Sequence, residues 1–262
     1  MPVKILFIGD IIGRPGRQAV SRELHRLVDH HRLDMVVANG ENAAGGFGIT
    51  EETAGDLFKC GIDLLTSGNH VWDKKESISF IDREERLLRP ANYPEGTPGR
   101  GSALFTTAGG VKIAVLNLEG RVFMNSLECP FRTADREIAL LREETPVILV
   151  DFHAEATSEK ESLGWYLDGR VSAVIGTHTH VQTADERVLP GGTAYITDAG
   201  MTGGIDSVIG IRKEEAISRF LSLLPSKFEV AKNNLRLNAV VITVDEASGR
   251  ALNIERVNTG CE

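Results

Sequence analysis

Residues 3–10 read Val-Lys-Ile-Leu-Phe-Ile-Gly-Asp, an almost continuous apolar run that ends in a glycine and an aspartate. Such a run is typical of a strand that is buried on both faces of a sheet, as in parallel sheets covered by helices. Two similar runs, residues 35–38 and 62–66, also end in glycine and polar side chains. Helical spacing over residues 17–31, and a helix predicted from Thr50 to Gly61, separate the three strands. This part of the chain therefore predicts three successive strand–helix units.

The rest of the chain adds strands of a different character. Residues 102–107 and 111–118 flank Ala108-Gly109-Gly110, which indicates an antiparallel hairpin, and a second hairpin is predicted around Ser248-Gly249. The other predicted elements are the helices 134–143, 158–167 and 213–224, the strands 146–151, 173–175 and 194–197, and the last hairpin strands 237–244 and 251–256. No repeat or linker interrupts them. We therefore expect a single α/β domain over residues 1–262, with mixed parallel and antiparallel strands flanked by helices.

The charge balance is acidic. The chain has 29 Lys and Arg against 37 Asp and Glu, a net charge of -8, within ordinary globular composition. A net-negative surface gives no general attraction to phosphate backbones or to anionic lipid. If the protein handles a phosphate, the positive charge must be local, and a bound metal ion is the simplest source. DNA and membranes are not expected partners.

The three cysteines, Cys60, Cys129 and Cys261, are widely spaced and form no C-x-x-C pair. This pattern is typical of reduced thiols in the cytoplasm, and it argues against a disulfide framework or a zinc ribbon. The first apolar run is too short for a signal-peptide core, and no later run approaches the ~18 residues of a membrane span. We expect a cytoplasmic protein.

Polar side chains recur where the predicted strands end, which is where open α/β sheets bind their ligands. Each such residue alone could cap a helix or serve a turn, but together they form a metal-ligand set of oxygen and nitrogen donors without a thiolate. His178 and His180 are two apart in a segment expected to be extended, so their imidazoles should project to the same side. A carboxylate among them can bridge two ions ~3.5–4 Å apart. The residues in question are Asp10, Glu41, Asn42, Asn69, His70, His153, His178 and His180.

Local signatures of other hydrolases are missing from the sequence. It contains no Gly-Lys-Ser/Thr phosphate loop, no G-x-S-x-G and no H-E-x-x-H. The sequence therefore gives no indication of a Walker-type nucleotide site, a serine hydrolase or a zinc peptidase.

The ordered blocks at the strand ends resemble those of the calcineurin-like metallophosphoesterases. These blocks are Asp10, Gly40-Glu41-Asn42, Gly68-Asn69-His70, His153 and Gly176-Thr177-His178-Thr179-His180. The closer resemblance is to the YmdB-type branch of bacterial phosphodiesterases, through residues 9–13, 151–160 and 197–203. Two departures from the superfamily, Ile12 in place of a histidine ligand and Glu41 in place of an aspartate, are shared with that branch.

The resemblance implies a calcineurin-like sandwich of mixed sheets and a centre of two metal ions. One ion would be held by Asp10, Glu41, Asn42 and His180, and the other by Glu41, Asn69, His153 and His178. An amide oxygen in place of an imidazole makes the first site harder, which favours iron or manganese, with zinc as the alternative. The family also implies a homo-oligomer.

The activity implied is phosphodiester hydrolysis, with cyclic nucleotides such as 2′,3′-cAMP as substrates and short RNA ends as further candidates. Water that bridges two divalent ions is acidic enough to supply the attacking hydroxide. His70, which is not an assigned ligand, is the expected acid for the departing alkoxide. Asp73 either orients His70 or caps the following helix.

Two alternatives remain open from the sequence. A phosphomonoesterase or nucleotidase would use the same ligands, because specificity lies in the surrounding loops. A non-catalytic regulator that binds metal and nucleotide is a different class, and it would have no need for the proton donor His70.

Overall fold

Two β-sheets packed face to face form the centre of the computed structural model, which describes residues 2–225 and 227–261. The strands of the first sheet, in spatial order, are β2 (Asp10–Ile11), β11 (Met201–Gly204), β14 (Leu235–Asp245), β1 (Pro2–Ile8), β3 (Met35–Asn39) and β4 (Leu64–Thr66), with β15 (Ala251–Gly260) paired to β14. β1, β3 and β4 run parallel, whereas β14 is antiparallel to β1. The sheet is therefore mixed, as expected.

The second sheet is also mixed. Its order is β5 (Ser102–Thr106), β6 (Lys112–Glu119), β7 (Ile148–His153), β8 (Ala173–Thr177), β10 (Ala194–Ile196) and β9 (Arg187–Val188). The predicted hairpin of β5 and β6 is antiparallel, and β6, β7, β8 and β10 run parallel. A small separate ribbon pairs β12 (Ser207–Val208) with β13 (Ile211–Arg212).

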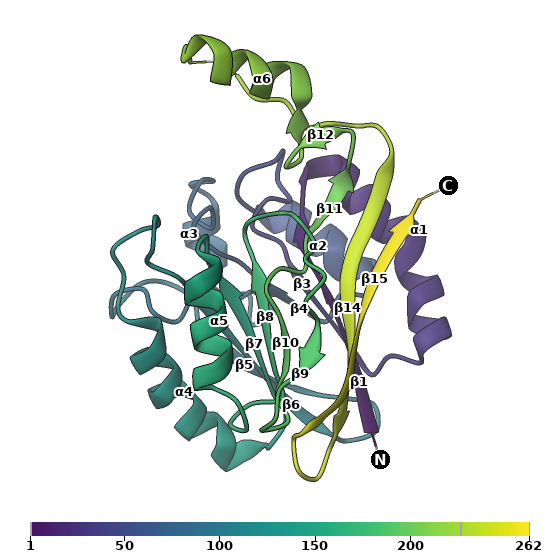
Figure 1. The fold of residues 1–262 in the computed structure, drawn as a ribbon, viewed down its shortest axis with the longest axis vertical. Helices are drawn as coiled ribbons and strands as arrows, with labels where there is room; N and C mark the ends of the chain where they lie inside the picture. Colours follow the sequence, from purple (N-terminus) through teal and green to yellow (C-terminus); the bar gives the residue numbers. More distant parts are fainter. Residues whose placement is uncertain (1, 226, 262) are drawn as a thin grey trace.

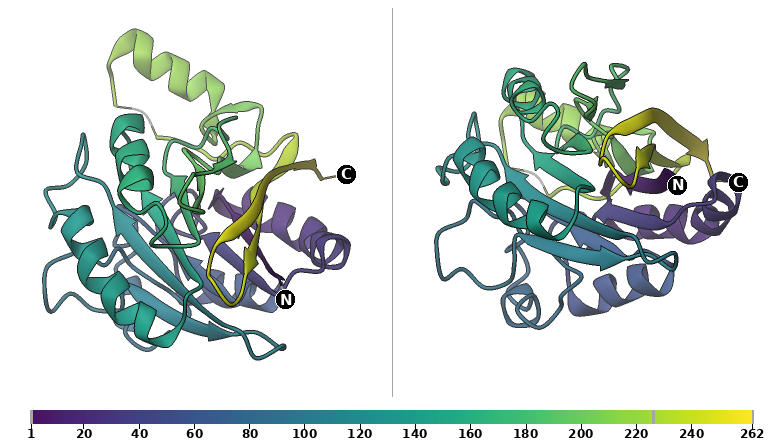
Figure 2. Two further views of the ribbon diagram at one scale, coloured as in Figure 1. Left: turned by 60° about the horizontal axis from the view of Figure 1, so that its bottom comes forward. Right: turned by 90° about the horizontal axis from the view of Figure 1, so that it is seen from below.

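Helices cover the outer faces of both sheets, as the turned views in Figure 2 show. An apolar cluster that includes Phe7, Leu149 and Ile242 fills the space between the sheets. A second cluster joins the first sheet to α1 (Gly13–His31) and α2 (Glu51–Lys59), and a third joins the second sheet to α4 (Pro130–Glu144) and α5 (Thr157–Tyr166). Each fully buried side chain of this kind stabilises the fold by about 1.5–3 kcal/mol.

Two helices begin earlier than the sequence predicts. α1 begins at Gly13 rather than near residue 17, and α4 begins at Pro130 rather than at residue 134. In both cases the proline lies in the first helical turn, where its missing N–H would have no intrahelical partner, so the helix tolerates it. The short elements β2, β9, β11, β12, β13 and α3 (Ser77–Phe80) were not predicted.

The parallel registers bring the carboxyl ends of the strands to one rim. In the first sheet Ile8 pairs with Ala38 and Asn39 pairs with Thr66. In the second sheet His153 lies between Glu119 and Thr177. The residues that follow these positions in the sequence are those predicted to form the site.

One helix stands apart from this body. α6 (Lys213–Ser222) follows the β12–β13 ribbon and projects away from the sheets (Figure 1). Within the described residues, no helix combines the length and the apolar character needed to cross a membrane.

Candidate metal centre

Four of the predicted ligands converge on one point at the rim. Nε2 of His153 lies 3.0 Å from Oδ1 of Asn69, 3.0 Å from Nδ1 of His178 and 3.1 Å from Oε1 of Glu41. A single ring nitrogen can share only one proton, so it cannot satisfy three partners at once. Several donor atoms at this spacing around a common point are the arrangement of a metal site, and those of Glu41, His153 and His178 lie within 4.8 Å of one another.

The other predicted ligands lie beside this group. Nε2 of His180 is 3.7 Å from Oδ1 of Asp10 and 3.4 Å from Nδ2 of Asn42, and that amide nitrogen is 3.1 Å from Oε1 of Glu41. Within the described residues, the buried Oδ1 of Asp10 has no hydrogen-bond partner. A buried carboxylate oxygen without a partner next to an imidazole is what a hard cation would satisfy. The residues therefore fit a metal ion.

Charge in the cluster also favours a cation. Burial alone would raise the pKa of Asp10 and of Glu41, but the neighbouring imidazoles of His180 and His153 lower both, so the carboxylates are ionised. Burial lowers the pKa of His153, yet Glu41 and Asp10 outweigh it and raise the pKa to about 10. His178 shows the reverse, because burial and the charge on His153 lower its pKa to about 3. Two buried carboxylates thus require positive charge at this point.

The ring of His153 is held by a relay that the sequence analysis missed. Its Nδ1 lies 2.9 Å from Oγ1 of Thr177, which in turn donates to Oδ1 of Asp151 at 2.7 Å. Asp151 is fully buried, also accepts from Asn39 and Thr66 of the first sheet, and burial raises its pKa to about 7. This relay holds a proton on Nδ1, so that Nε2 is the ring nitrogen that would give up its proton on binding a metal. A single aspartate within an apolar strand was the available signal.

The two histidines after β8 reach the site by a different route from the one predicted. β8 ends at Thr177, and His178 and His180 have positive φ angles of 97° and 66°, so the segment is not extended. The expectation that strand alternation aligns the imidazoles was wrong. Instead, the two left-handed residues direct His178 toward His153 and His180 toward Asp10.

His70 lies beside the ligand cluster but is not one of the predicted ligands. Its backbone N–H donates to Oε2 of Glu41 at 3.0 Å, and its Nδ1 lies 2.8 Å from Oδ2 of Asp73. Of the two alternatives for Asp73, contact with His70 is the one observed, while the following helix begins only at Ser77. The rings of His70 and Phe47 also make an edge-to-face contact, with centroids 5.2 Å apart.

A pocket of about 340 Å³ opens onto this cluster. Glu41, His70, His178 and His180 line its polar side, and its apolar walls are Ile12, Phe47, Ile209 and Ile211. Ile12 thus supplies a wall at the position where the superfamily pattern has a histidine. The main-chain oxygen of Ile209 lies 2.9 Å from Nδ1 of His180, so the β12–β13 ribbon also fixes the orientation of that ring.

Close backbone contacts surround the cluster. A Cβ at Gly68 would lie 2.1 Å from Cδ2 of His153, and a Cβ at Gly9 would lie 1.9 Å from the main-chain oxygen of Gly200. Neither position can accept a side chain without displacing its neighbour. These two glycines let Asn69 and Asp10 approach the site.

Glu119 is a further buried carboxylate that the sequence analysis did not single out. It lies at the end of β6, beside His153 in the sheet, with the side chains of Tyr93 and Asn125 nearby. Burial raises its pKa to about 7. It is not one of the converging ligands.

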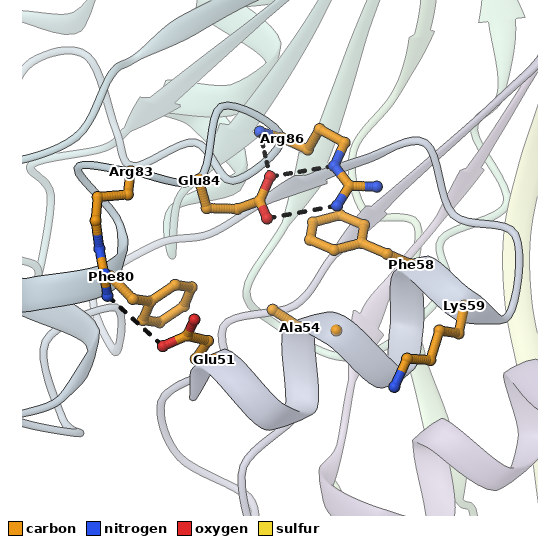
Figure 3. A pocket seen from close by; sticks show the side chains of 9 residues that line it. Glu51, Ala54, Phe58, Lys59, Phe80, Arg83, Glu84 and Arg86 are labelled. Carbon is orange, nitrogen blue, oxygen red and sulfur yellow. Dashed lines mark hydrogen bonds and ion pairs between the residues drawn. The ribbon is translucent and has the colours of Figure 1, made fainter.

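A larger groove elsewhere on the surface does not contain this chemistry. It measures about 490 Å³ and lies between α2 and residues 80–86 (Figure 3). Four of its charged side chains form two ion pairs, Glu84 with Arg86 at 3.1 Å and Glu51 with Arg83 at 3.7 Å. The guanidinium of Arg86 covers the ring of Phe58 at 3.8 Å. None of the predicted site residues lines this groove.

Two facing mixed sheets, with a cluster of carboxylate, amide and imidazole side chains at their shared rim, form the fold of the calcineurin-like metallophosphoesterases. The match to a family model is more specific. The chain belongs to the YmdB-like protein family, whose model matches residues 6–257.

Known relatives cover almost the whole chain. A 2′,3′-cyclic-nucleotide 2′-phosphodiesterase of Bacillus subtilis (strain 168) is 52% identical over 97% of this chain and 96% of its own length. The crystal structure of a hypothetical protein from Thermus thermophilus superposes with a TM-score of 0.93 at 43% identity, covering 99% of this chain and 100% of that one. The crystal structure of a novel Mycoplasma pneumoniae phosphatase gives 0.92 at 34% identity, covering 99% and 94%.

Proposed function

We propose that this protein is a metal-dependent phosphodiesterase that hydrolyses small phosphodiesters, with 2′,3′-cyclic nucleotides as the main class. The observation that carries this proposal is the convergence of Glu41, Asn69 and His178 on Nε2 of His153, at 3.0–3.1 Å. The substrate class is supported by the activity named for the Bacillus subtilis relative, which shares 52% of its residues with this chain.

The centre is proposed to hold two metal ions. Asp10, Glu41, Asn42 and His180 would bind one, and Glu41, Asn69, His153 and His178 the other. A half-turn of the Asn42 amide exchanges its nitrogen and oxygen and presents the oxygen to the first site. Iron or manganese suits this oxygen-rich set, and zinc is the alternative. When bound, two such ions supply an acidified water and neutralise charge on the phosphoryl oxygens.

The protein's own residues are proposed to manage the leaving group and the nucleoside. Asp73 engages Nδ1 of His70, which leaves Nε2 of that ring to give its proton to the departing alkoxide. Phe47 and Ile209 form apolar walls of the pocket beside His70 and His180. A nucleobase against Phe47 would place the ribose and its cyclic phosphate over the ligand cluster.

Turnover of 2′,3′-cAMP by the purified protein tests this function. We expect hydrolysis with Mn²⁺ that a chelator removes and that added Mn²⁺ restores. Faster cleavage of phenyl phosphate than of bis-phenyl phosphate would instead identify a phosphomonoesterase. Nucleotide binding without any product after long incubation with Mn²⁺ would identify a regulator.

We also propose that the chain works as one domain that self-associates. The core between the sheets draws on strands from both ends of the chain, which supports a single domain. α6 and the turn after it expose large apolar side chains, with Phe220 at 80% and Leu221 at 83% exposure. Exposed apolar patches are typical of protein interfaces, so light scattering should detect an oligomer that polar substitutions on α6 dissociate.

Location and further substrates are proposed on chemical grounds. The three cysteines are free thiols, which is consistent with the reducing cytoplasm. Short RNA ends that carry a cyclic phosphate share the reacting group of the proposed substrates. The net charge of -8 disfavours DNA.

A further inference from the structure

A buried ion pair lies directly behind the proposed ligands. Nζ of Lys160, in the first half of α5, donates to Oδ2 of Asp198 at 2.7 Å. Their side chains are 1% and 0% exposed. Neither residue reaches the pocket at the metal centre, and the proposed function assigns them no role.

Asp198 holds the residue that lies between the two histidine ligands. Its Oδ2 accepts from the backbone N–H of Thr179 at 3.0 Å and from the Thr179 hydroxyl at 2.7 Å. Three donors, one of them Nζ of Lys160, therefore share a single carboxylate oxygen. Contacts of this number and length fix Thr179 more firmly than a turn in solvent would.

The backbone on either side of Thr179 has a conformation that requires stabilising contacts. His178 and His180 are both left-handed, with φ of 97° and 66°, a conformation that non-glycine residues rarely adopt. Backbone of this kind persists only when its surroundings determine it. Asp198 supplies that constraint between the two ligands, and α5 packs against β8, the strand that leads into the segment (Figure 1).

The other oxygen of Asp198 reaches toward the Asp10 side of the centre. Oδ1 accepts from the backbone N–H of Gly200 at 2.8 Å. A Cβ on Gly9 would lie only 1.9 Å from the main-chain oxygen of Gly200. The turn at Gly200 therefore packs tightly against Gly9, the residue before Asp10. The Asp198 carboxylate thus binds backbone N–H groups of Thr179, which lies between His178 and His180, and of Gly200, which packs against Gly9 next to Asp10.

We propose that the Lys160–Asp198 ion pair positions the segment 177–180, so that His178 and His180 present their ring nitrogens to the metal centre. This inference rests on the proposed function. Simple stabilisation of the fold explains the pair less well, because buried ion pairs are often no more stabilising than apolar side chains of similar volume. The pair accounts for Lys160 and Asp198, two residues of the family-like stretches 151–160 and 197–203.

Removing both charges separates positioning from stability. Lys160→Met/Asp198→Asn leaves no unpaired buried charge, so its melting temperature without metal should stay close to that of the wild type. Its affinity for Mn²⁺, measured by calorimetry, should nevertheless fall by about 10- to 100-fold, because an amide offers one neutral acceptor oxygen where the carboxylate accepts from both Thr179 and Gly200. Mn²⁺ affinity within twofold of the wild type, in a folded double variant, overturns the inference.

Thr179 offers a second test if the double variant does not fold. Thr179→Ser keeps the hydroxyl donor to Asp198, whereas Thr179→Val removes it at nearly constant volume. We expect Thr179→Val to bind Mn²⁺ more weakly than Thr179→Ser, and equal affinities would overturn the inference.

Asp168→Asn is the matched control. Asp168 also accepts from loop N–H groups, those of Gly191 at 2.7 Å and Thr193 at 3.3 Å, but at the opposite end of β10. Its substitution should leave Mn²⁺ affinity unchanged. If the wild type itself takes up no metal, the proposed function fails; if the wild type binds Mn²⁺ and the variants match it, only the positioning role fails.

Discussion

Nδ1 of His70 lies 2.8 Å from Oδ2 of Asp73, and this contact decides which nitrogen of the ring is available to a substrate. The two residues are three apart and are joined by a turn in which the Asp73 N–H donates to the His70 main-chain oxygen at 3.0 Å. The contact therefore forms within one short segment next to Asn69, and Nε2 is left for proton transfer.

Replacing His70 should separate catalysis from metal binding. We expect His70→Ala to lower kcat on 2′,3′-cAMP by about 10²- to 10⁴-fold, the usual contribution of a general acid. Its metal content, measured by elemental analysis, should equal that of the wild type, because no ligand has been removed. Near-wild-type turnover would eliminate His70 as the acid.

Replacing Asp73 should have a smaller effect. The Asp73 side chain is 43% exposed, and exposed ion pairs contribute about 0.2–1 kcal/mol. We therefore expect Asp73→Asn to lower kcat by about 1.5- to 5-fold with KM unchanged. If Asp73 acts through His70, adding Asp73→Asn to His70→Ala should lower kcat no further. A further loss of about 1.5- to 5-fold in the double variant would contradict this role.

Glu41 should be required for metal binding as well as for activity. Glu41→Gln removes a buried charge that contacts His153 at 3.1 Å, and we expect Mn²⁺ affinity to fall by about 100-fold. In Mn²⁺ at about 100 times the wild-type Kd, the wild type should gain roughly 5–10 °C in melting temperature, which the variant should largely lose.

Glu119→Gln provides the control for that experiment. Glu119 is equally buried and lies next to His153 in the sheet, but among the described residues its side chain forms no hydrogen bond to a proposed ligand. Burial raises its pKa to about 7, so its neutral form, which glutamine resembles, is already populated near neutral pH. Metal loss in Glu119→Gln similar to that in Glu41→Gln would point to a general effect of buried charge.

Phe47 should determine affinity for the nucleobase. Stacking on an aromatic side chain is worth about 1–3 kcal/mol per base, so Phe47→Ala should raise KM for 2′,3′-cAMP by about 5- to 100-fold. Ribose 2′,3′-cyclic phosphate without a base should be cleaved equally well by both proteins. Trp165→Ala removes a half-exposed aromatic ring that packs near Arg187 and serves as the control. Equal losses on both substrates would contradict the stacking role.

The sequence is sufficient to predict which residues lie at the carboxyl ends of the parallel strands. β1, β3 and β4 are apolar runs closed by glycine and polar residues, and the parallel sheet brings their carboxyl ends together. That is sufficient to gather Asp10, Glu41 and Asn69 without any knowledge of loop conformation.

What the sequence could not supply depends on long-range contacts and on backbone conformation. The short strands β2 and β11 form only because Asp10 pairs with Met201, far along the chain. Nothing local in the sequence shows that His178 and His180 are left-handed, so strand alternation is not what brings their imidazoles to the rim. Asp198 and Asp151 act through partners in other elements, which a linear pattern does not reveal.

The close contacts at Gly9 and Gly68 limit how this protein can diversify. Even one methyl group at either position would collide with the backbone of Gly200 or the ring of His153. Substitutions at Gly9 and Gly68 are therefore excluded, and new substrate specificities must arise from the apolar pocket walls that include Phe47 and Ile209. A mutant library aimed at altered substrates should keep Gly9 and Gly68 and randomise Phe47 and Ile209.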